Sequence, residues 1–258
     1  MKLFQIVRCA LLVACAATQS VSAQDVKGNP AAGEKKAAQC IGCHGIQGYR
    51  ASFPEIYRVP MIFGQSEKYI VSALGGYKRG ERKHPTMRGV VDNLSDQDIA
   101  DLAMYYASTK TPSHAPSASG NPVDSQAAMA LVQKGGCVAC HGENFSKPVD
   151  PAYPKIAGQY ADYLAVALKS YKVEGGTVVG RANPIMGGMV KQFSNDELRL
   201  IANYVASLPG DLETIPQKRF RSGIFTISRI QLRVAKPIAP LLARPEFRIG
   251  ICGHDKNT

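Results

Sequence analysis

Two stretches of the chain carry the same arrangement of apolar and polar positions. In residues 69–77 and again in residues 163–171, apolar and aromatic side chains recur every three or four positions. This spacing puts them on one face of an α-helix. We therefore predict two equivalent amphipathic helices. Their matching positions are Tyr69, Ile70, Ala73, Leu74 and Tyr77 in the first and Tyr163, Leu164, Ala167, Leu168 and Tyr171 in the second.

A second pair of helices is predicted from capping signals. Ser95 precedes Asp98 by three residues and Ser194 precedes Glu197 by three, which is the pattern of a capping box at a helix start. An apolar stripe at helical spacing follows each box. The stripes consist of Ile99, Leu102, Ala103 and Tyr106 in one helix and Leu198, Ile201, Ala202 and Val205 in the other.

The chain is thus an internal repeat, and we expect two all-α halves. Each half opens on an Asn-Pro pair, at Asn29 and at Asn121. Asparagine is favoured at the N-cap of a helix and proline at its first position. A segment of the form P-x-x-x-G-Q follows in each half, at residues 60–65 and 154–159. No alternating strand pattern competes with the helical one within residues 24–216.

The net charge of +11 belongs mostly to the two ends of the chain. Residues 1–23 contribute +2 and residues 217–258 contribute +7, so residues 24–216 carry only +2. Nucleic-acid binding needs a basic surface, and we exclude it for residues 24–216. The tail does not follow the repeat, and we expect it to be disordered, either as a membrane- or partner-binding segment or as altered coding sequence without function. The expected parts are a signal peptide (1–23), a first domain (24–111), a Pro/Ser/Gly-rich linker (112–122), a second domain (123–216) and the tail (217–258).

Residues 1–23 have the features of a secretory signal peptide. A positively charged start precedes a short apolar run, and the small residues at 21–23 form a cleavage site. The mature chain is then expected to begin at Gln24, in the bacterial periplasm. An alternative is that residues 12–15 act as a lipoprotein cleavage box, which would leave Cys15 lipidated and the protein attached to the outer face of the inner membrane.

The chemistry of each half centres on a C-x-x-C-H motif. This pattern is typical of a covalently attached c-type haem. The two thiols each add to one vinyl group of a porphyrin, and the histidine that follows binds the iron. A redox dithiol or a zinc site is the alternative. A thioredoxin-like dithiol should lie near a βαβ pattern, which the sequence does not show, and zinc does not explain a histidine directly after the second cysteine in both copies. We expect two covalent haem c groups, held by Cys40, Cys43 and His44 and by Cys137, Cys140 and His141.

A methionine in each half is the expected sixth ligand of its iron. Met87 and Met186 both lie eight residues before the capping serine, on what is predicted to be a loop. Methionine ligation fills the sixth position and raises the reduction potential. His84 is the alternative in the first half, where it would give bis-histidine ligation. Met189 is expected to pack in the core, because its counterpart in the first half is Val90.

Four further residues repeat beside these ligands. The carbonyl groups of Pro60 and Pro154 are expected to accept the ring N–H of the proximal histidine and fix its tautomer. Arg82 and Arg181 each lie five residues before the methionine. Each arginine is expected either to pair with haem propionates or to lie in solvent.

With these residues placed, residues 24 to about 216 resemble the dihaem cytochrome c4 family. The two C-x-x-C-H-G motifs, the two P-x-x-x-G-Q segments and the two methionines carry the resemblance. It implies two class I cytochrome c domains, each folded around one His/Met haem and related by a pseudo-twofold axis. It also implies contact between the first and last helix of each half, with Gly33 meeting Tyr105 and Ala130 meeting Tyr204.

The resemblance implies electron transfer rather than catalysis. Members of this family carry electrons, commonly towards a haem–copper terminal oxidase, and often associate with the inner membrane. We therefore expect a periplasmic one-electron carrier, with a quinol-oxidising complex or a dehydrogenase as donor and a terminal oxidase as acceptor. The alternative is the dihaem electron-accepting subunit of a dehydrogenase, such as a flavocytochrome that oxidises sulfide. A dihaem peroxidase or a gas sensor needs an open sixth position at an iron, which the matched methionines argue against.

Overall fold

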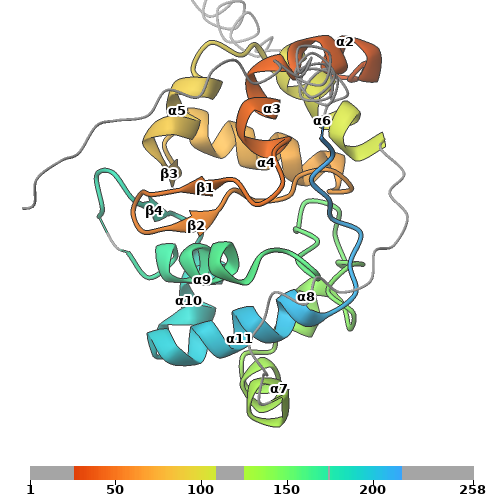
Figure 1. Ribbon diagram of the computed structural model, residues 1–258. Helices are drawn as coiled ribbons and strands as arrows, with labels where there is room; N and C mark the ends of the chain where they lie inside the picture. The colour runs from red at the N-terminus through yellow and green to blue at the C-terminus, as the bar shows by residue number, and fades with distance from the viewer. Residues whose placement is uncertain (1–25, 109–124, 174, 217–258) are drawn as a thin grey trace, which may run out of the picture. The chain divides into compact units, whose positions relative to one another are not determined.

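The computed structural model describes residues 26–108, 125–173 and 175–216, and the compact unit to which they belong ends at Pro216. The predicted signal peptide, linker and tail lie outside the described residues. In chain order the helices are α2 (Pro30–Lys36), α3 (Ala38–His44), α4 (Glu67–Lys78), α5 (Pro85–Val91), α6 (Asp96–Ser108), α7 (Ser125–Lys134), α8 (Val138–His141), α9 (Ala161–Ser170), α10 (Pro184–Lys191) and α11 (Asn195–Ser207), and the strands are β1 (Arg50–Ala51), β2 (Tyr57–Arg58), β3 (Arg82–Lys83) and β4 (Gly180–Arg181) (Figure 1).

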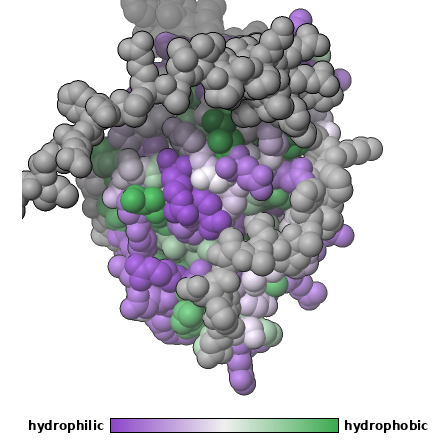
Figure 2. All heavy atoms as spheres, viewed as in Figure 1, coloured by the Kyte–Doolittle hydropathy of each residue, from purple (hydrophilic) through white to green (hydrophobic). Residues whose placement is uncertain are grey.

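The predicted all-α class is confirmed. Helices α2–α6 recur as α7–α11, and each of the described strands has two residues. On the face shown in Figure 2, hydrophilic side chains alternate with small groups of hydrophobic ones. Among the helices of the described ranges, none combines the length and the apolar character needed to span a bilayer.

Predicted helix starts are confirmed by their capping bonds. The side-chain oxygen of Asn29 accepts the N–H of Ala31 at 2.9 Å and caps α2. In both predicted capping boxes, at the starts of α6 and α11, the backbone N–H of the serine donates to the carboxylate, and the serine Oγ accepts the backbone N–H of the acidic residue. The start predicted at Asn121 lies outside the described residues. The two boxes pair Ser95 with Asp98 and Ser194 with Glu197.

In the first half, α2 and α4 pack against α6 (Figure 1). The core between them contains fully buried side chains such as Val91 and Leu102. The backbones of α2 and α6 lie close together at Gly33, where a Cβ atom would lie 2.1 Å from the carbonyl oxygen of Asp101 and 2.7 Å from Cβ of Tyr105. Only glycine fits this crossing, and the expected contact of Gly33 with Tyr105 is present.

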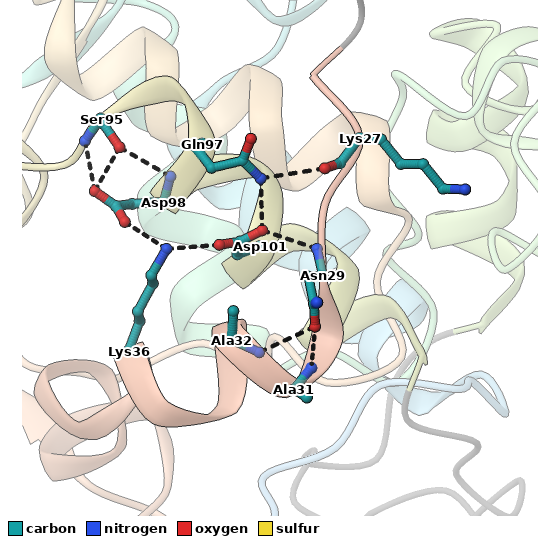
Figure 3. A network of polar contacts seen from close by, with 9 residues as sticks. All are labelled: Lys27, Asn29, Ala31, Ala32, Lys36, Ser95, Gln97, Asp98 and Asp101. Carbon is teal, nitrogen blue, oxygen red and sulfur yellow. Dashed lines mark hydrogen bonds and ion pairs between the residues drawn. The ribbon is translucent and has the colours of Figure 1, made fainter.

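A buried carboxylate ties α2 to α6 (Figure 3). Asp101 is 3 % exposed, and its Oδ1 accepts the N–H of Asn29 at 2.8 Å and Nε2–H of Gln97 at 2.7 Å. Its Oδ2 lies 2.6 Å from Nζ of Lys36, which also pairs with Asp98 at 2.6 Å. The Lys36 ammonium group holds the pKa of both carboxyl groups below the usual range. The network thus fixes the first helix of this half on its last helix.

In the second half, α7 and α9 pack against α11. The small buried residue of α7 is Ala128, whereas Ala130 is exposed, so Ala128 and not Ala130 takes the place of Gly33 in the packing. A turn with Gly136 at φ +57° separates α7 from the second motif. Because of this turn, Ala128 lies two residues further from its histidine than the equivalent Gly33 does. The register of the whole helix is shifted accordingly.

Short strands connect the two halves. β1 and β2 pair within the first half, with Arg50 opposite Arg58. β3 belongs to the first half and β4 to the second, and they pair antiparallel with Arg82 opposite Arg181. This pair brings the segments that precede the two methionine helices into register with each other.

The segment after α11 returns to the first half and completes it. The N–H of Glu213 donates to the carbonyl oxygen of Phe63 at 3.1 Å. Gly64, at φ +81°, passes so close to this segment that a Cβ atom would lie 2.1 Å from the carbonyl oxygen of Asp211. The side chain of Ile215 packs against the core of the first half. The first half is therefore built partly from residues at the end of the second.

Candidate functional site

The two C-x-x-C-H motifs lie in equivalent short helices. α3 carries Cys40 and Cys43 one turn apart and ends at His44. α8 begins directly after Cys137 and ends at His141. All four thiols of the motifs are free and half-buried. Each motif thus presents two thiols and an imidazole from about one turn of helix, which is the donor set of a covalent haem.

Each of the two histidines has one ring nitrogen held by a backbone carbonyl group. His44 Nδ1 lies 2.8 Å from the carbonyl oxygen of Pro60, and His141 Nδ1 lies 3.2 Å from that of Pro154. These are the two carbonyl groups predicted from the sequence. Burial lowers the pKa of both imidazoles, which keeps the rings neutral at pH 7. A neutral ring that donates from Nδ1 presents the lone pair of Nε2 to a metal.

Met87 and Met186 lie in short helices rather than on the predicted loops. Each is the third residue of its helix, α5 or α10, and follows a proline at the first position. The N-cap side chain accepts the N–H of the methionine, at 3.3 Å from His84 and at 2.9 Å from Asn183. Both methionines are half-buried against the core of their own half. The Asn-Pro and His-Pro starts of these helices are visible in the sequence and could have revealed them.

The two rival ligands are placed differently. Both ring nitrogens of His84 are engaged, since Nδ1 accepts the N–H of Met87 and Nε2 lies 2.9 Å from the hydroxyl oxygen of Tyr57. In this arrangement His84 caps α5 and offers no free nitrogen to an iron. Met189 is not the core residue predicted from the sequence, because 45 % of its surface is exposed. The geometry therefore favours Met87 and Met186.

Arg82 and Arg181 face each other across the β3–β4 pair and are surrounded by tyrosines. Each guanidinium group lies between 5.0 and 5.7 Å from the centroids of two tyrosine rings. In the described part of the chain neither forms an ion pair with a carboxylate, and Nε of Arg82 is buried without a hydrogen-bond partner. Two cations directly opposite each other destabilise a strand pair unless an anion lies between them. The rings are Tyr69 and Tyr77 for Arg82 and Tyr163 and Tyr171 for Arg181.

The role of these tyrosines was missed in the sequence, where they are part of an apolar stripe. Tyrosines in an apolar stripe could have indicated this role, because a buried tyrosine usually needs a partner for its hydroxyl group. Tyr106 was missed too: it is buried, and its hydroxyl has no hydrogen-bond partner among the residues described. Burial and then the neighbouring Cys40 thiol raise the pKa of Tyr106. Val205 takes the equivalent place in the second half, so the two sites differ here.

The residues of both halves fit a haem c group. Two thiols and a neutral imidazole come from each motif, and the unpaired Nε of Arg82 marks a place for an anionic substituent such as a propionate. A zinc site shared by the two motifs would need at least three ligands to converge. Over the ranges that the structure describes, no three His, Cys, Asp or Glu side chains do so.

Known proteins resemble the chain in both halves. A family model described as cytochrome c matches residues 30–110 and 125–209. The chain is 34 % identical over 197 residues to cytochrome c4 from Azotobacter vinelandii, and this match covers 70 % of this chain and 90 % of that protein. It is 28 % identical over 196 residues to a thiosulfate dehydrogenase electron acceptor from Stutzerimonas stutzeri, and this match covers 72 % of this chain and 83 % of that protein. The crystal structure of reduced recombinant cytochrome c4 from Pseudomonas stutzeri matches with a TM-score of 0.57 and 28 % identity, over 70 % of this chain and 99 % of that one.

Proposed function

Since the chain belongs to the dihaem cytochrome c4 family of c-type cytochromes and is an electron carrier of that type, we propose that it works in the periplasm and passes electrons singly towards a terminal oxidase. The observation that carries the proposal is the matched pair of sites. Each half offers two thiols, a histidine with a fixed tautomer and a capped methionine. A haem held by both the histidine and the methionine would supply one-electron chemistry and would leave no position for a substrate.

The chain's own residues would hold each haem and set its surroundings. Bound haem c supplies a one-electron iron couple. Nε2 of the histidine and Sδ of the methionine would bind the iron, and the proline carbonyl and the N-cap would hold these ligands in place. Cys40, Cys43, Cys137 and Cys140 are proposed to attach the two haems, and the proposed iron ligands are His44, Met87, His141 and Met186.

Arg82 and Arg181 are proposed to bind the propionates. Their guanidinium groups lie in register across the β3–β4 pair, so each is available to a group held in either half. The surrounding tyrosines shield them from water, which strengthens their attraction for a carboxylate. A positive charge kept near both sites would also favour the reduced, less positive iron.

The proposed location rests on the leader. Residues 1–23 have the charged start, apolar run and cleavage site of an exported protein. In the periplasm the donor would be a quinol-oxidising complex or a dehydrogenase, and the acceptor a terminal oxidase. Lipidation of Cys15 would attach the chain to the outer face of the inner membrane.

A second candidate is the electron-accepting subunit of a dehydrogenase. The similarity to a thiosulfate dehydrogenase electron acceptor favours it, because that match spans most of both proteins. The same two sites would then receive electrons inside a stable complex with the catalytic subunit. Purification from the native host at natural abundance separates the two candidates. Co-purification of a dehydrogenase subunit in a fixed ratio would favour the electron-accepting subunit over the free carrier as the function of this chain.

The test of the carrier function is spectroscopy of the purified, haem-loaded chain with and without carbon monoxide and peroxide. We expect two low-spin haems, a near-infrared methionine–iron band and no binding of either ligand. A high-spin fraction, or ready binding of carbon monoxide at one iron, would show that one methionine is not bound. Peroxide turnover would then make the protein a peroxidase.

A further inference from the structure

Two buried glutamines bridge the halves in opposite directions. Gln159 of the second half is 4 % exposed and holds the backbone of Met61 in the first half. Its Nε2–H donates to the Met61 carbonyl oxygen at 2.9 Å, and its Oε1 accepts the Met61 N–H at 3.1 Å. A side-chain amide that pairs with both groups of one backbone residue is held in a single orientation.

The reverse bridge has the same form. Gln65 of the first half is 6 % exposed and holds the backbone of Lys155 in the second half. Its Nε2–H donates to the Lys155 carbonyl oxygen at 2.9 Å, and its Oε1 accepts the Lys155 N–H at 2.9 Å. Each glutamine is the last residue of its P-x-x-x-G-Q segment and binds the second residue of the other copy.

The peptide group that each glutamine binds also holds a motif histidine. The Pro60 carbonyl group, which His44 Nδ1 contacts at 2.8 Å, belongs to the same peptide group as the Met61 N–H. A hydrogen-bond chain therefore runs from His44 through this peptide group to Gln159. In the other half it runs from His141 through the Pro154–Lys155 peptide group to Gln65.

We propose that each glutamine is a positioning residue that tunes the iron potential of the opposite half. Gln159 acts through His44, and Gln65 acts through His141. This inference rests on the assignment above of the two histidines as proximal ligands. A peptide group whose N–H donates a hydrogen bond is polarised, so its carbonyl group becomes a better acceptor. The histidine then gains negative character, which makes it a stronger ligand of oxidised iron.

The predicted effect crosses the interface. Loss of Gln159 weakens the hydrogen bond that His44 donates, so the iron of the first half becomes easier to reduce. Its equilibrium constant for reduction should rise by roughly threefold, given that a neighbouring hydrogen bond strengthens another by a modest fraction. The iron of the second half should keep its potential. Loss of Gln65 should do the reverse.

The experiment compares Gln159→Leu with Gln65→Leu in the full, haem-loaded chain, each serving as the control for the other. The two potentials are measured by following haem methyl resonances of each half during a redox titration. The Nδ1–H proton of each histidine is observed in the reduced protein. We expect the His44 proton to move upfield in Gln159→Leu and the His141 proton to move upfield in Gln65→Leu.

A further variant guards against failure to fold, because Leu at 159 removes the partner of the Met61 N–H, the Tyr160 N–H and the Met61 carbonyl oxygen. At this buried position Gln159→Glu is favoured as the neutral acid, which keeps a donor for the Met61 carbonyl oxygen and a weaker acceptor for the Met61 N–H, so the His44 proton should move upfield by less than in Gln159→Leu. Equal shifts at both irons, shifts in the same half as the substitution, or no shift would overturn the inference. Absence of upfield methionine signals from the wild-type protein would instead overturn the His/Met assignment, and the inference with it.

Discussion

Arg58 of the first half and Asp162 of the second form an ion pair, with Arg58 Nε 3.1 and 2.9 Å from the two carboxylate oxygens. The N–H of Arg58 also donates to this carboxylate at 3.2 Å. The guanidinium group lies 4.5 Å from the ring centroid of Tyr160. With 15 % and 25 % of the two side chains exposed, the pair is largely shielded from water. It joins β2 to the start of α9.

This pair should contribute measurably to stability. A double-mutant cycle of Arg58→Ala and Asp162→Ala is expected to give a coupling of about 1–2 kcal/mol in the free energy of unfolding, between the values for exposed and fully buried pairs. The matched control is the exposed pair of Arg79 and Glu81, where we expect less than about 0.5 kcal/mol. Equal couplings from denaturant unfolding of the two sets would contradict the prediction.

Met87 and Met186 should each bind a different iron. Met87→Ala and Met186→Ala are each expected to remove about half of the near-infrared methionine–iron band and to lower one of the two potentials, because methionine ligation raises the potential. Met189→Ala is the control and should change neither the band nor the potentials. Near-infrared absorption and redox titration provide the measurements. A spectral change in Met189→Ala would show that Met186 has been wrongly assigned.

His84 should act as a helix cap and not as a ligand. His84→Asn reproduces the cap that Asn183 provides in the second half, so the low-spin spectrum should be retained. His84→Ala removes the cap and should lower the stability of methionine ligation in the first half by about 1 kcal/mol. Alkaline or denaturant titration of the methionine–iron band measures this loss. Loss of the band in the asparagine variant would refute the capping role.

The arginine pair should raise both potentials. Arg82→Gln and Arg181→Gln are each expected to lower both, because the two guanidinium groups lie in register across the halves and each removed charge had favoured reduced iron. Arg79→Gln, at an exposed position, is the control and should have little effect. Spectroelectrochemical titration measures all three. Unchanged potentials in both buried variants would exclude the proposed contact with propionates.

The network around Asp101 should make stability depend on acid pH. The Lys36 ammonium group and the donors of Asn29 and Gln97 hold the pKa of Asp101 below its unfolded value of about 3.9. The folded protein therefore binds fewer protons, and this stabilisation is full above that value and is lost as the pH falls through the folded pKa. Urea unfolding between pH 3 and pH 7 should show a weaker pH dependence in Asp101→Asn. An unchanged dependence would contradict this account.

Much of the local structure could be predicted from the chain alone. The boxes at Ser95 and Ser194 depend on residues three positions apart, and the structure has both. Counting back from the cysteines could not show that Ala128 and not Ala130 is the buried residue of α7, because the glycine turn before Cys137 adds residues to the second copy of the repeat. The starts of α5 and α10, directly after His84 and Asn183, could have been predicted from the proline that follows each of these residues, although a loop was expected there.

Contacts between the halves were beyond prediction from local pattern. Gln65 and Gln159 were recognised as repeated, but periodicity does not show that each binds the other copy. The same holds for Arg82 and Arg181, whose shared strand pair joins residues far apart in the chain. Such contacts depend on tertiary packing, and a single sequence contains no direct signal of them.

Residues 211–215 pack against the first half, so the first half can be completed only after the end of the second half has been synthesised. A chain synthesised from its N-terminus releases the first half well before the segment that fills its edge at Phe63 and Gly64. An isolated first half would lack the contacts that residues 211–215 make at Phe63 and Gly64.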